Sequence, residues 1–551
     1  MGARALLRAL FLRGFCLTAI PTTVILSGEI GRGRGDMAIY TINLGNTLRR
    51  TAHKYPDRVA LVSHEGERLT YHQLDRMSNR FANALVKLGI KKGEHIATLF
   101  LNCNEQLIAF FGILKIGGVV LPVNVRLAAP EMHWILDHSD STAVIFSKGF
   151  KDRVERLRPE LTGIRHYVMV GKDPPPHTLS FEEVLDKGGD EDPGQEVGGD
   201  DEAFLLYTAG TTGRPKGVLL THNGLIWNCV SWTHAGVYRE DDLSLHVFPL
   251  YHIAALGSVL TYVYLGGTIY LKEAFDPKDC METIERERIT RWAAAPTVFN
   301  MLLQLPEIER YHTTSLTLLG SGAAIMPSDT QRRLREVFPS AQIFDTYGMT
   351  EASGGITTLP PRDSTRKVAC VGRPVIGVEM RVVDENDRDV APGEVGEVVF
   401  RGNNLMKGYY KDPEATEGAM RGGWYRTGDL GRLDDEGYLY IVDRRKDMIV
   451  TGGENVYPRE VEEVLYSHPK IAETAVIGVA DSKWGEAIKA VVVLESGETT
   501  SEEEIIDFCR ERIAGFKCPK SVDFVQALPK NPAGKILKRE LRQRYGKSIT
   551  Y

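Results

Sequence analysis

The chain has 551 residues, which is too long for one compact hydrophobic core, so two or more domains are expected. Its 43% hydrophobic and 25% charged residues are typical of a soluble globular protein, and a net charge of −6 without an extended basic block beyond the first residues argues against a nucleic-acid binder. Seven scattered cysteines without a Cys-x-x-Cys spacing indicate reduced thiols in a cytoplasmic protein, not a zinc site or a disulfide framework.

Residues 1–36 differ from the rest of the chain. Arginines alternate with apolar side chains at the start, and an apolar run from Phe15 to Leu26 follows, interrupted by Pro21. This run is short for a membrane-spanning helix. We interpret the segment as a disordered or mis-assigned extension, and the alternative is a signal peptide or membrane anchor.

Regular patterning begins near Leu69. Thr70 and Gln73 have the spacing of a capping box, apolar residues then recur with helical period, and Gly89 ends this helix. Further on, the pattern predicts a helix over 106–115 and strands over 95–99, 119–121, 142–146 and 167–170. Such alternation predicts a parallel sheet flanked by helices, which we expect to act as scaffold.

A glycine-rich loop between Tyr207 and Val218 separates two apolar runs, so the pattern predicts strand, loop, strand. Glycines let the backbone approach a ligand closely, and hydroxyls, N–H groups and a lysine suit a polyphosphate. The order of residues is not that of a Walker A loop. A long hairpin loop without a ligand is the alternative. The predicted phosphate-binding residues are Thr208, Ala209, Gly210, Thr211, Thr212, Gly213 and Lys216.

Two later segments carry residues suited to the rest of a nucleotide. The small residues of 320–324 let an aromatic base lie flat against the backbone. Tyr347 can stack on adenine, Thr350 offers a hydroxyl to the α-phosphate, and Glu351 offers a hard oxygen ligand for Mg²⁺. The predicted nucleotide-binding residues are Gly322, Ala323, Ala324, Asp345, Thr346, Tyr347, Gly348 and Thr350, and the predicted metal ligands are Thr208 and Glu351.

The predicted secondary-structure pattern of the remaining chain changes twice. Short alternating strands over 379–383, 397–400 and 437–442 predict a small β-barrel, and Asp429 within it suits a ribose diol because a carboxylate accepts two hydroxyl hydrogens well. The last hundred residues predict a small α+β domain. Its signals are Pro458 at a helix start, strands over 473–479 and 487–494, and a capping box at Ser501 and Glu504.

Together these motifs resemble the adenylate-forming superfamily of acyl-CoA synthetases, peptide-synthetase adenylation domains and luciferases. Tyr347-Gly-Met-Thr-Glu351 matches the family's Tyr-Gly-x-Thr-Glu motif, whereas Ala209 stands where the family usually has Ser. The resemblance runs from about residue 37 to 545, and Met37 looks like an ordinary family start. It implies an α/β fold. A large N-terminal domain of two flanked mixed or parallel sheets plus the barrel (37–443) is joined by a hinge (444–447) to a smaller, mobile α+β domain (448–551).

The resemblance also implies roles for single residues. His252 matches a gate or orienting residue at the acyl pocket, and Thr297 ends a segment of small residues that we interpret as pocket wall. Arg444 matches the arginine that contacts ribose and phosphate, Lys446 the hinge position, and Lys535 the catalytic lysine that holds the substrate carboxylate and the α-phosphate. The loop that lines the pantetheine channel corresponds to Gly452, Gly453 and Glu454.

The activity that the resemblance implies is that of an AMP-forming acyl-CoA ligase using ATP, Mg²⁺ and CoA. A carboxylate attacks the α-phosphorus of ATP and expels pyrophosphate. The small domain then rotates about Lys446, and the CoA thiol displaces AMP. The expected partner is a small-molecule carboxylic acid. A homodimer and peripheral membrane association through residues 1–36 are kept open.

The substrate is the least determined part. Residues 443–449 and the C-terminal part look most like bacterial fatty-acid CoA ligases, so a medium- or long-chain fatty acid is expected. An aryl-CoA ligase of the cinnamate or benzoate type is the runner-up. A luciferase-like oxygenase that uses an adenylate and a non-catalytic interaction protein are further alternatives.

Overall fold

The computed structural model describes residues 42–208, 215–322, 326–530 and 535–546, all of which lie in one compact unit, residues 41–551. The predicted N-terminal segment, Ala209 to Gly213 of the phosphate loop, Ala323 and Ala324 lie outside the described residues. Among the described helices, none is both long and apolar enough to cross a membrane.

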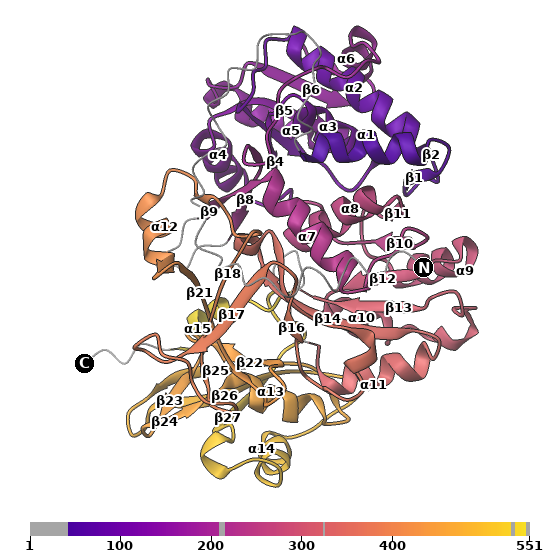
Figure 1. Cartoon of the computed structure of the whole chain (residues 1–551). Coiled ribbons are helices and arrows are strands. Elements are labelled where there is room, and N and C mark those ends of the chain that lie inside the picture. Colours follow the sequence, from indigo (N-terminus) through magenta and orange to yellow (C-terminus); the bar gives the residue numbers. More distant parts are fainter. Residues whose placement is uncertain (1–41, 209–214, 323–325, 531–534, 547–551) are drawn as a thin grey trace, which may run out of the picture. The chain divides into compact units, whose positions relative to one another are not determined.

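An eight-stranded sheet forms the first part of the chain (Figure 1). Its strand order is β19-β9-β8-β4-β3-β5-β6-β7, and β4, β3, β5, β6, β7 and β8 run parallel, as the alternating pattern predicts. The bounds are β3 (His95–Leu99), β4 (Val119–Pro122), β5 (Ser141–Ser147), β6 (His166–Val170), β7 (Leu179–Ser180), β8 (Glu202–Thr208), β9 (Lys216–Thr221) and β19 (Gly408–Tyr409).

Helices α2 (Tyr71–Lys87) and α3 (Asn104–Lys115) pack on each other and carry much of the first core. The predicted capping box at the start of α2 is confirmed, because Thr70 accepts from the Gln73 N–H and Gln73 accepts from the Thr70 N–H. The other helices of the large part are α1 (Leu44–Lys54), α4 (Ala129–His138), α5 (Lys151–Leu157), α6 (Phe181–Lys187), α9 (Pro277–Glu287), α10 (Pro296–Leu302), α11 (Ser328–Val337) and α12 (Pro413–Ala419).

A nine-stranded sheet follows, in the order β16-β15-β14-β13-β12-β10-β11-β1-β2. Its bounds are β1 (Val59–Val62), β2 (Arg68–Thr70), β10 (Leu243–His246), β11 (Thr268–Leu271), β12 (Arg291–Ala294), β13 (Leu318–Ser321), β14 (Gln342–Met349), β15 (Gly354–Leu359) and β16 (Arg373–Pro374). The strands from β14 to β1 are parallel. Their carboxyl ends therefore share one edge, which is where open α/β sheets bind ligands. Helices α7 (His222–His234) and α8 (Ile253–Leu265) pack in the core shared with this sheet.

The segment predicted as a small β-barrel is antiparallel, with the order β17-β18-β21-β20 and β22 paired to β21. Its bounds are β17 (Val378–Val383), β18 (Gly396–Gly402), β20 (Met420–Arg421), β21 (Trp424–Leu433) and β22 (Leu439–Arg444). Asp429 and Arg444 are partners in the β21–β22 register, so the sheet itself brings two predicted nucleotide residues together.

The last sheet has the order β24-β23-β26-β25, with β27 on β26 (Figure 1). It is covered by helices, as an α+β domain requires. The bounds are β23 (Ile449–Thr451), β24 (Glu454–Val456), α13 (Pro458–Tyr466), β25 (Ile471–Asp481), β26 (Gly485–Leu494), α14 (Glu502–Arg510), β27 (Ser521–Phe524) and α15 (Lys538–Tyr545). Ser501 caps α14 by accepting from the Glu504 N–H, which confirms the predicted helix start.

Candidate active site

The phosphate loop is the connection of a β-hairpin. Thr208 ends β8, Lys216 begins β9, and these two residues are partners across the antiparallel pair. The predicted arrangement of strand, loop and strand is therefore confirmed on both sides of the loop. Of the predicted phosphate-binding residues of this loop, the structure describes Thr208 and Lys216, at its two ends.

Tyr409 connects the phosphate loop to Glu351. Glu351 lies on a short 3-10 turn, Thr350–Ala352, directly after β14. The Tyr409 hydroxyl donates to Glu351 Oε1 at 3.0 Å and lies 3.0 Å from the Tyr425 hydroxyl. The Lys216 ammonium lies 4.8 Å from the centre of the Tyr409 ring, a cation–π distance. One aromatic side chain thus fixes the predicted metal ligand and contacts the predicted phosphate-binding lysine.

Asp429 has two protein partners and is almost fully buried, with 4% of its surface exposed. The Tyr347 hydroxyl donates to its Oδ2 at 2.7 Å, and the Arg444 Nε lies 3.1 Å from its Oδ1. A carboxylate has about four lone-pair sites, so two partners leave acceptor capacity for a diol. The three residues that the sequence assigned to ribose and adenine are therefore in direct contact.

The β14 segment before Glu351 is tightly constrained. Asp345 is buried, accepts from the Thr346 N–H through Oδ1, and its Oδ2 has no hydrogen-bond partner among the described residues. Burial raises the pKa of Asp345 well above its ordinary value, so the side chain is a candidate donor. Thr346 donates to the Ser321 carbonyl at 3.2 Å, close to Gly322. A Cβ on Gly348 would meet the Gly354 carbonyl oxygen at 1.8 Å, so only glycine fits there.

Lys535 lies among these charges although it comes from the C-terminal segment. Burial, together with the positive charge of Arg444, lowers the pKa of Lys535 to about 8, and Asp429 opposes that shift. Lys446 is exposed in the turn between β22 and β23, and partial desolvation, followed by the Arg444 charge, lowers its pKa too. The structure therefore brings Lys535, Arg444 and Asp429 into one electrostatic neighbourhood, as adenylate formation would require.

Gly452, Gly453 and Glu454 form the exposed turn of the β23–β24 hairpin in the last sheet. The two glycines have φ values of 61° and 86°, which favour glycine. The Gly452 N–H donates to the Trp484 carbonyl at 2.9 Å, and Trp484 is 45% exposed. The turn presents a rigid surface to solvent, and its role in CoA binding stays a prediction.

A narrow cavity of about 50 Å³ lies next to these residues. Its lining includes Thr346 and Gly322, and its walls combine aromatic side chains with alanines. The aromatic wall residues are Trp232, Tyr238, Phe248 and Phe344, and the alanines are Ala254, Ala255, Ala293 and Ala294. Its position beside the nucleotide residues makes it the candidate acyl pocket.

The structure changes the predicted composition of this pocket. His252 and Thr297 are not among its lining residues, and residues two or three positions away line it instead. His252 precedes α8, its carbonyl accepts from the first turn, and its ring lies 4.7 Å from that of Tyr251. Burial lowers the pKa of His252 to about 4, so its ring is neutral. The small side chains predicted to make room, in the segment 293–297, are represented in the lining by Ala293 and Ala294.

Sequence reasoning missed Tyr409, Tyr425 and the pocket residues on α7 and α8. Tyr409 follows Gly408 in a two-residue strand without periodic signal, so no local pattern marks it.

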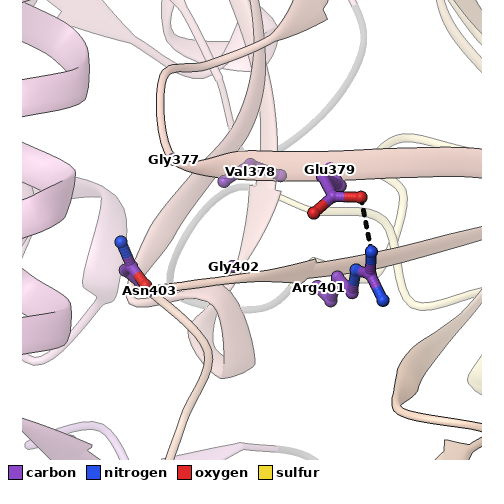
Figure 2. A pocket seen from close by; sticks show the side chains of 6 residues that line it. All are labelled: Gly377, Val378, Glu379, Arg401, Gly402 and Asn403. Carbon is purple, nitrogen blue, oxygen red and sulfur yellow. Dashed lines mark hydrogen bonds and ion pairs between the residues drawn. The ribbon is translucent and has the colours of Figure 1, made fainter. Parts of the chain in front are cut away.

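A second hollow, on the third sheet, is lined by Gly377, Val378, Glu379, Arg401, Gly402 and Asn403 (Figure 2). Arg401 there is already paired with Glu379 at 2.7 Å, so this hollow offers no uncompensated charge to a ligand.

Comparison with known proteins follows the same division of the chain. Residues 48–410 match the model of the AMP-binding enzyme family, and residues 460–535 match that of the AMP-binding enzyme C-terminal domain. The chain is 38% identical over 517 residues to the long-chain-fatty-acid–CoA ligase FadD13 of Mycobacterium tuberculosis, covering 92% of this chain and 99% of the relative.

Two other relatives act on aromatic acids by name. The feruloyl-CoA synthase of an Amycolatopsis species is 39% identical over 504 residues, covering 91% of this chain and 99% of the relative. The crystal structure of the anthranilate CoA ligase AuaEII in complex with anthranoyl-AMP superposes with a TM-score of 0.87 at 28% identity, covering 92% of this chain and 98% of that one.

Proposed function

Because the chain belongs to the AMP-binding enzyme family, and within it is an AMP-forming acyl-CoA ligase, we propose that it activates a compact aromatic carboxylic acid with ATP and transfers it to CoA. The observation that carries this proposal is the closed end of the acyl pocket. Tyr262 and Arg291 have no exposed surface and are joined by a hydrogen bond of 2.8 Å from Arg291 Nη1 to the Tyr262 hydroxyl.

The end wall lies close behind the pocket. Arg291 stacks 3.6 Å from the Tyr238 ring centre and 4.8 Å from that of Phe344, and both rings line the cavity. Same-face residues on a strand are about 6.6 Å apart, so the step from Ala293 to Arg291 is about that deep. An extended alkyl chain would have to displace this buried network. A flat ring is shorter than such a chain and would lie between the aromatic walls and the alanines.

One alternative substrate class remains beside this proposal. A medium- or long-chain fatty acid, the expectation from the sequence, stays a prediction, and the name of FadD13 supports it. The names of the feruloyl and anthranilate ligases support an aromatic acid instead, in agreement with the pocket walls. A homodimer and membrane association through residues 1–36 also stay predictions.

The adenylation roles follow from the contacts. Asp429, oriented by Tyr347 and Arg444, holds the ribose diol, and the loop that Lys216 ends holds the phosphates. Lys535 supplies a positive charge beside Arg444, where the substrate carboxylate meets the α-phosphate. Attack forms the bond from carboxylate oxygen to α-phosphorus and breaks the bond to pyrophosphate. Positioning and charge neutralisation are what such a step needs from the protein.

The residues present fit a magnesium ion bound together with ATP. Among the described residues no group of three or more His, Cys, Asp or Glu side chains can hold a metal by itself. Mg²⁺ is usually held by one or two carboxylates plus substrate phosphates, and Glu351 offers that carboxylate with Thr208 as a hydroxyl on the loop side. The ion, when bound, would neutralise charge on the phosphates. Glu351 and Thr208 are the residues that would hold it.

Replacing Tyr409 with phenylalanine tests whether Tyr409 is a positioning residue for Glu351. Losing the hydrogen bond to Glu351 Oε1 is expected to raise the Mg²⁺ concentration for half-maximal pyrophosphate release about tenfold, with a smaller effect on the rate at saturating Mg²⁺. Tyr410→Phe is the matched control, because its hydroxyl donates to Asp140 instead. Equal Mg²⁺ requirements in both variants would refute this role of Tyr409.

The pKa of Lys535 sets the expected pH dependence of adenylation. Below pH 8 Lys535 of the free enzyme is charged, and its charge is lost as the pH rises through its lowered pKa of about 8. The kcat/KM of ATP for pyrophosphate release without CoA should therefore fall above pH 8, since that parameter reports free-enzyme groups. Lys535→Arg, whose guanidinium stays charged, should move the fall to higher pH. An unchanged profile in that variant would assign the fall to another group.

The proposed substrate class is tested by pyrophosphate release from ATP with single acids. The kcat/KM values are compared along an aliphatic series from acetate to palmitate and across benzoate, cinnamate and their hydroxylated derivatives. We expect the highest values among the aromatic acids. A maximum at an aliphatic acid of eight or more carbons would overturn the proposal and return the assignment to a fatty acid.

A further inference from the structure

We propose that the closed end of the acyl pocket is a subsite for an uncharged oxygen substituent, a hydroxyl or carbonyl, on the part of the acid farthest from its carboxylate. The inference rests on the proposed function and names the chemistry of that substrate more closely. It is carried by polar atoms of residues that line or back the cavity, for which the described residues offer no hydrogen-bond partner of standard geometry.

Two of these atoms belong to lining residues. Ser258 on α8 is 3% exposed and Trp232 on α7 is 5% exposed. The Ser258 hydroxyl, which faces the Tyr238 hydroxyl, and the Trp232 indole N–H make no hydrogen bond of standard geometry among the described residues. A buried donor without a partner destabilises a protein, so two of them at one cavity point to a ligand acceptor.

Arg291 adds further donors behind the same wall. Its Nη1 donates to the Tyr262 hydroxyl, while its Nε and Nη2 have no hydrogen-bond partner among the described residues. Ser244 is the register partner of Arg291, and His246 lies two residues further along the same face of β10. The Ser244 hydroxyl lies 3.1 Å from His246 Nε2, and His246 lines the cavity.

At the closed end of the pocket, the positive charge of Arg291 already has an acidic counterpart in the protein. This favours an uncharged substituent on the substrate. The Tyr262 hydroxyl, which accepts from Arg291, donates to Asp242 Oδ2 at 3.1 Å. Asp242 is buried and its carboxyl group faces Arg291 through that tyrosine; burial raises the pKa of Asp242, and the Arg291 charge opposes that shift. A second carboxylate on the substrate would bring a negative charge toward Asp242 and would lose its hydration. A hydroxyl or carbonyl uses the same donors without that cost.

The depth of the pocket fits a para-type substituent. Along α8, Ala254, Ser258 and Tyr262 lie on one face at intervals of four residues, or about 6 Å each. Ala254 and Ser258 line the cavity, and Tyr262, one turn further along, contacts the lining residue Tyr238 and accepts from Arg291. An acid whose carboxylate lies near Thr346 would therefore reach the donors with a group on the opposite side of a ring.

The test compares three acids that differ only at the far end: cinnamate, 4-hydroxycinnamate and 4-carboxycinnamate. The measured quantity is the kcat/KM of pyrophosphate release for each acid relative to cinnamate. We expect the wild-type enzyme to favour the hydroxy acid at least tenfold and to reject the dicarboxylate. Ser258→Ala and Trp232→Phe, which each remove one donor, should each lower the hydroxy preference several-fold.

Thr261→Val is the matched control on the same helix. The Thr261 hydroxyl donates to the Gly257 carbonyl of its own helix, so its loss should leave the hydroxy preference unchanged. Arg291→Lys, which keeps the buried charge but loses the forked set of guanidinium donors, is the second probe. We expect this variant to be soluble and to show a reduced preference for the hydroxy acid.

The outcomes separate this inference from the function on which it rests. Turnover of cinnamate without any preference for the hydroxy acid, or a preference that survives both Ser258→Ala and Trp232→Phe, overturns the subsite alone. Preference for the dicarboxylate overturns the uncharged class. If no aromatic acid is turned over, the proposed function fails, and the subsite is then decided by the same ratio for an active alkanoate and its ω-hydroxy derivative.

Discussion

Lys535→Ala is expected to lower pyrophosphate release by about 10³-fold, while acyl transfer from a preformed acyl-adenylate to CoA continues near the wild-type rate. The reason is the place of Lys535. Its ammonium is buried in the same electrostatic neighbourhood as Asp429 and Arg444, where negative charge from carboxylate and α-phosphate would gather. The second half-reaction needs the CoA thiol at the carbonyl carbon instead, so it does not depend on this charge.

The two half-reactions are measured separately, by pyrophosphate release without CoA and by acyl-CoA formation from synthetic acyl-adenylate. Lys530→Ala is the matched control. Lys530 lies five residues earlier on the same segment, but its ammonium pairs with Glu473 at 2.6 Å within the last sheet. A similar loss in both half-reactions for Lys535→Ala, or an equal loss in the Lys530 variant, would refute the assigned role.

Lys446→Pro is expected to show the opposite pattern, with adenylation retained and thioester formation reduced about 10²-fold. Lys446 lies in the turn between β22 and β23, the link between the third and the last sheet. Its N–H makes no backbone hydrogen bond among the described residues, so proline removes none. Proline fixes φ near −65°, however, and a hinge must change its backbone angles.

The contacts that a rotation would have to break are specific. Glu463 on α13 accepts from both the N–H and the hydroxyl of Ser328 on α11, and Arg459 donates to the Ile441 carbonyl. The arrangement that holds these contacts is also the one that places Lys535 beside Arg444, so locking it spares the first half-reaction. Lys446→Ala is the control that removes the side chain but leaves the backbone free. Equal thioester rates for the two variants would contradict the hinge.

Sequence analysis predicted most of the scaffold because local rules and tertiary packing agree there. The capping box at Thr70, the N-cap at Ser501 and the hairpin around the phosphate loop are all present. The pairing of Asp429 with Arg444 was predictable because both are motif residues, and the strand register brings them together.

The acyl pocket was not predictable in the same way. Arg291 lies in an otherwise apolar strand, and the sequence around it does not reveal that it stacks on Tyr238 and donates to Tyr262. Those contacts join residues that are 29 and 53 positions apart. The expected residues His252 and Thr297 lie close in sequence to residues of the pocket but are not among its lining residues. Which side chains line a cavity depends on helix rotation and strand register, and no local pattern fixes these to within one residue.

The most direct test of the central claim is a competition experiment with CoA present. The enzyme receives ATP, Mg²⁺, CoA and an equimolar mixture of octanoate, palmitate, benzoate, cinnamate and 4-hydroxycinnamate, and the acyl-CoA products are identified by mass spectrometry at low conversion. The account predicts that an aromatic acyl-CoA dominates, with 4-hydroxycinnamoyl-CoA the most abundant, and that AMP forms in equal amount. Dominance of octanoyl-CoA or palmitoyl-CoA would contradict it.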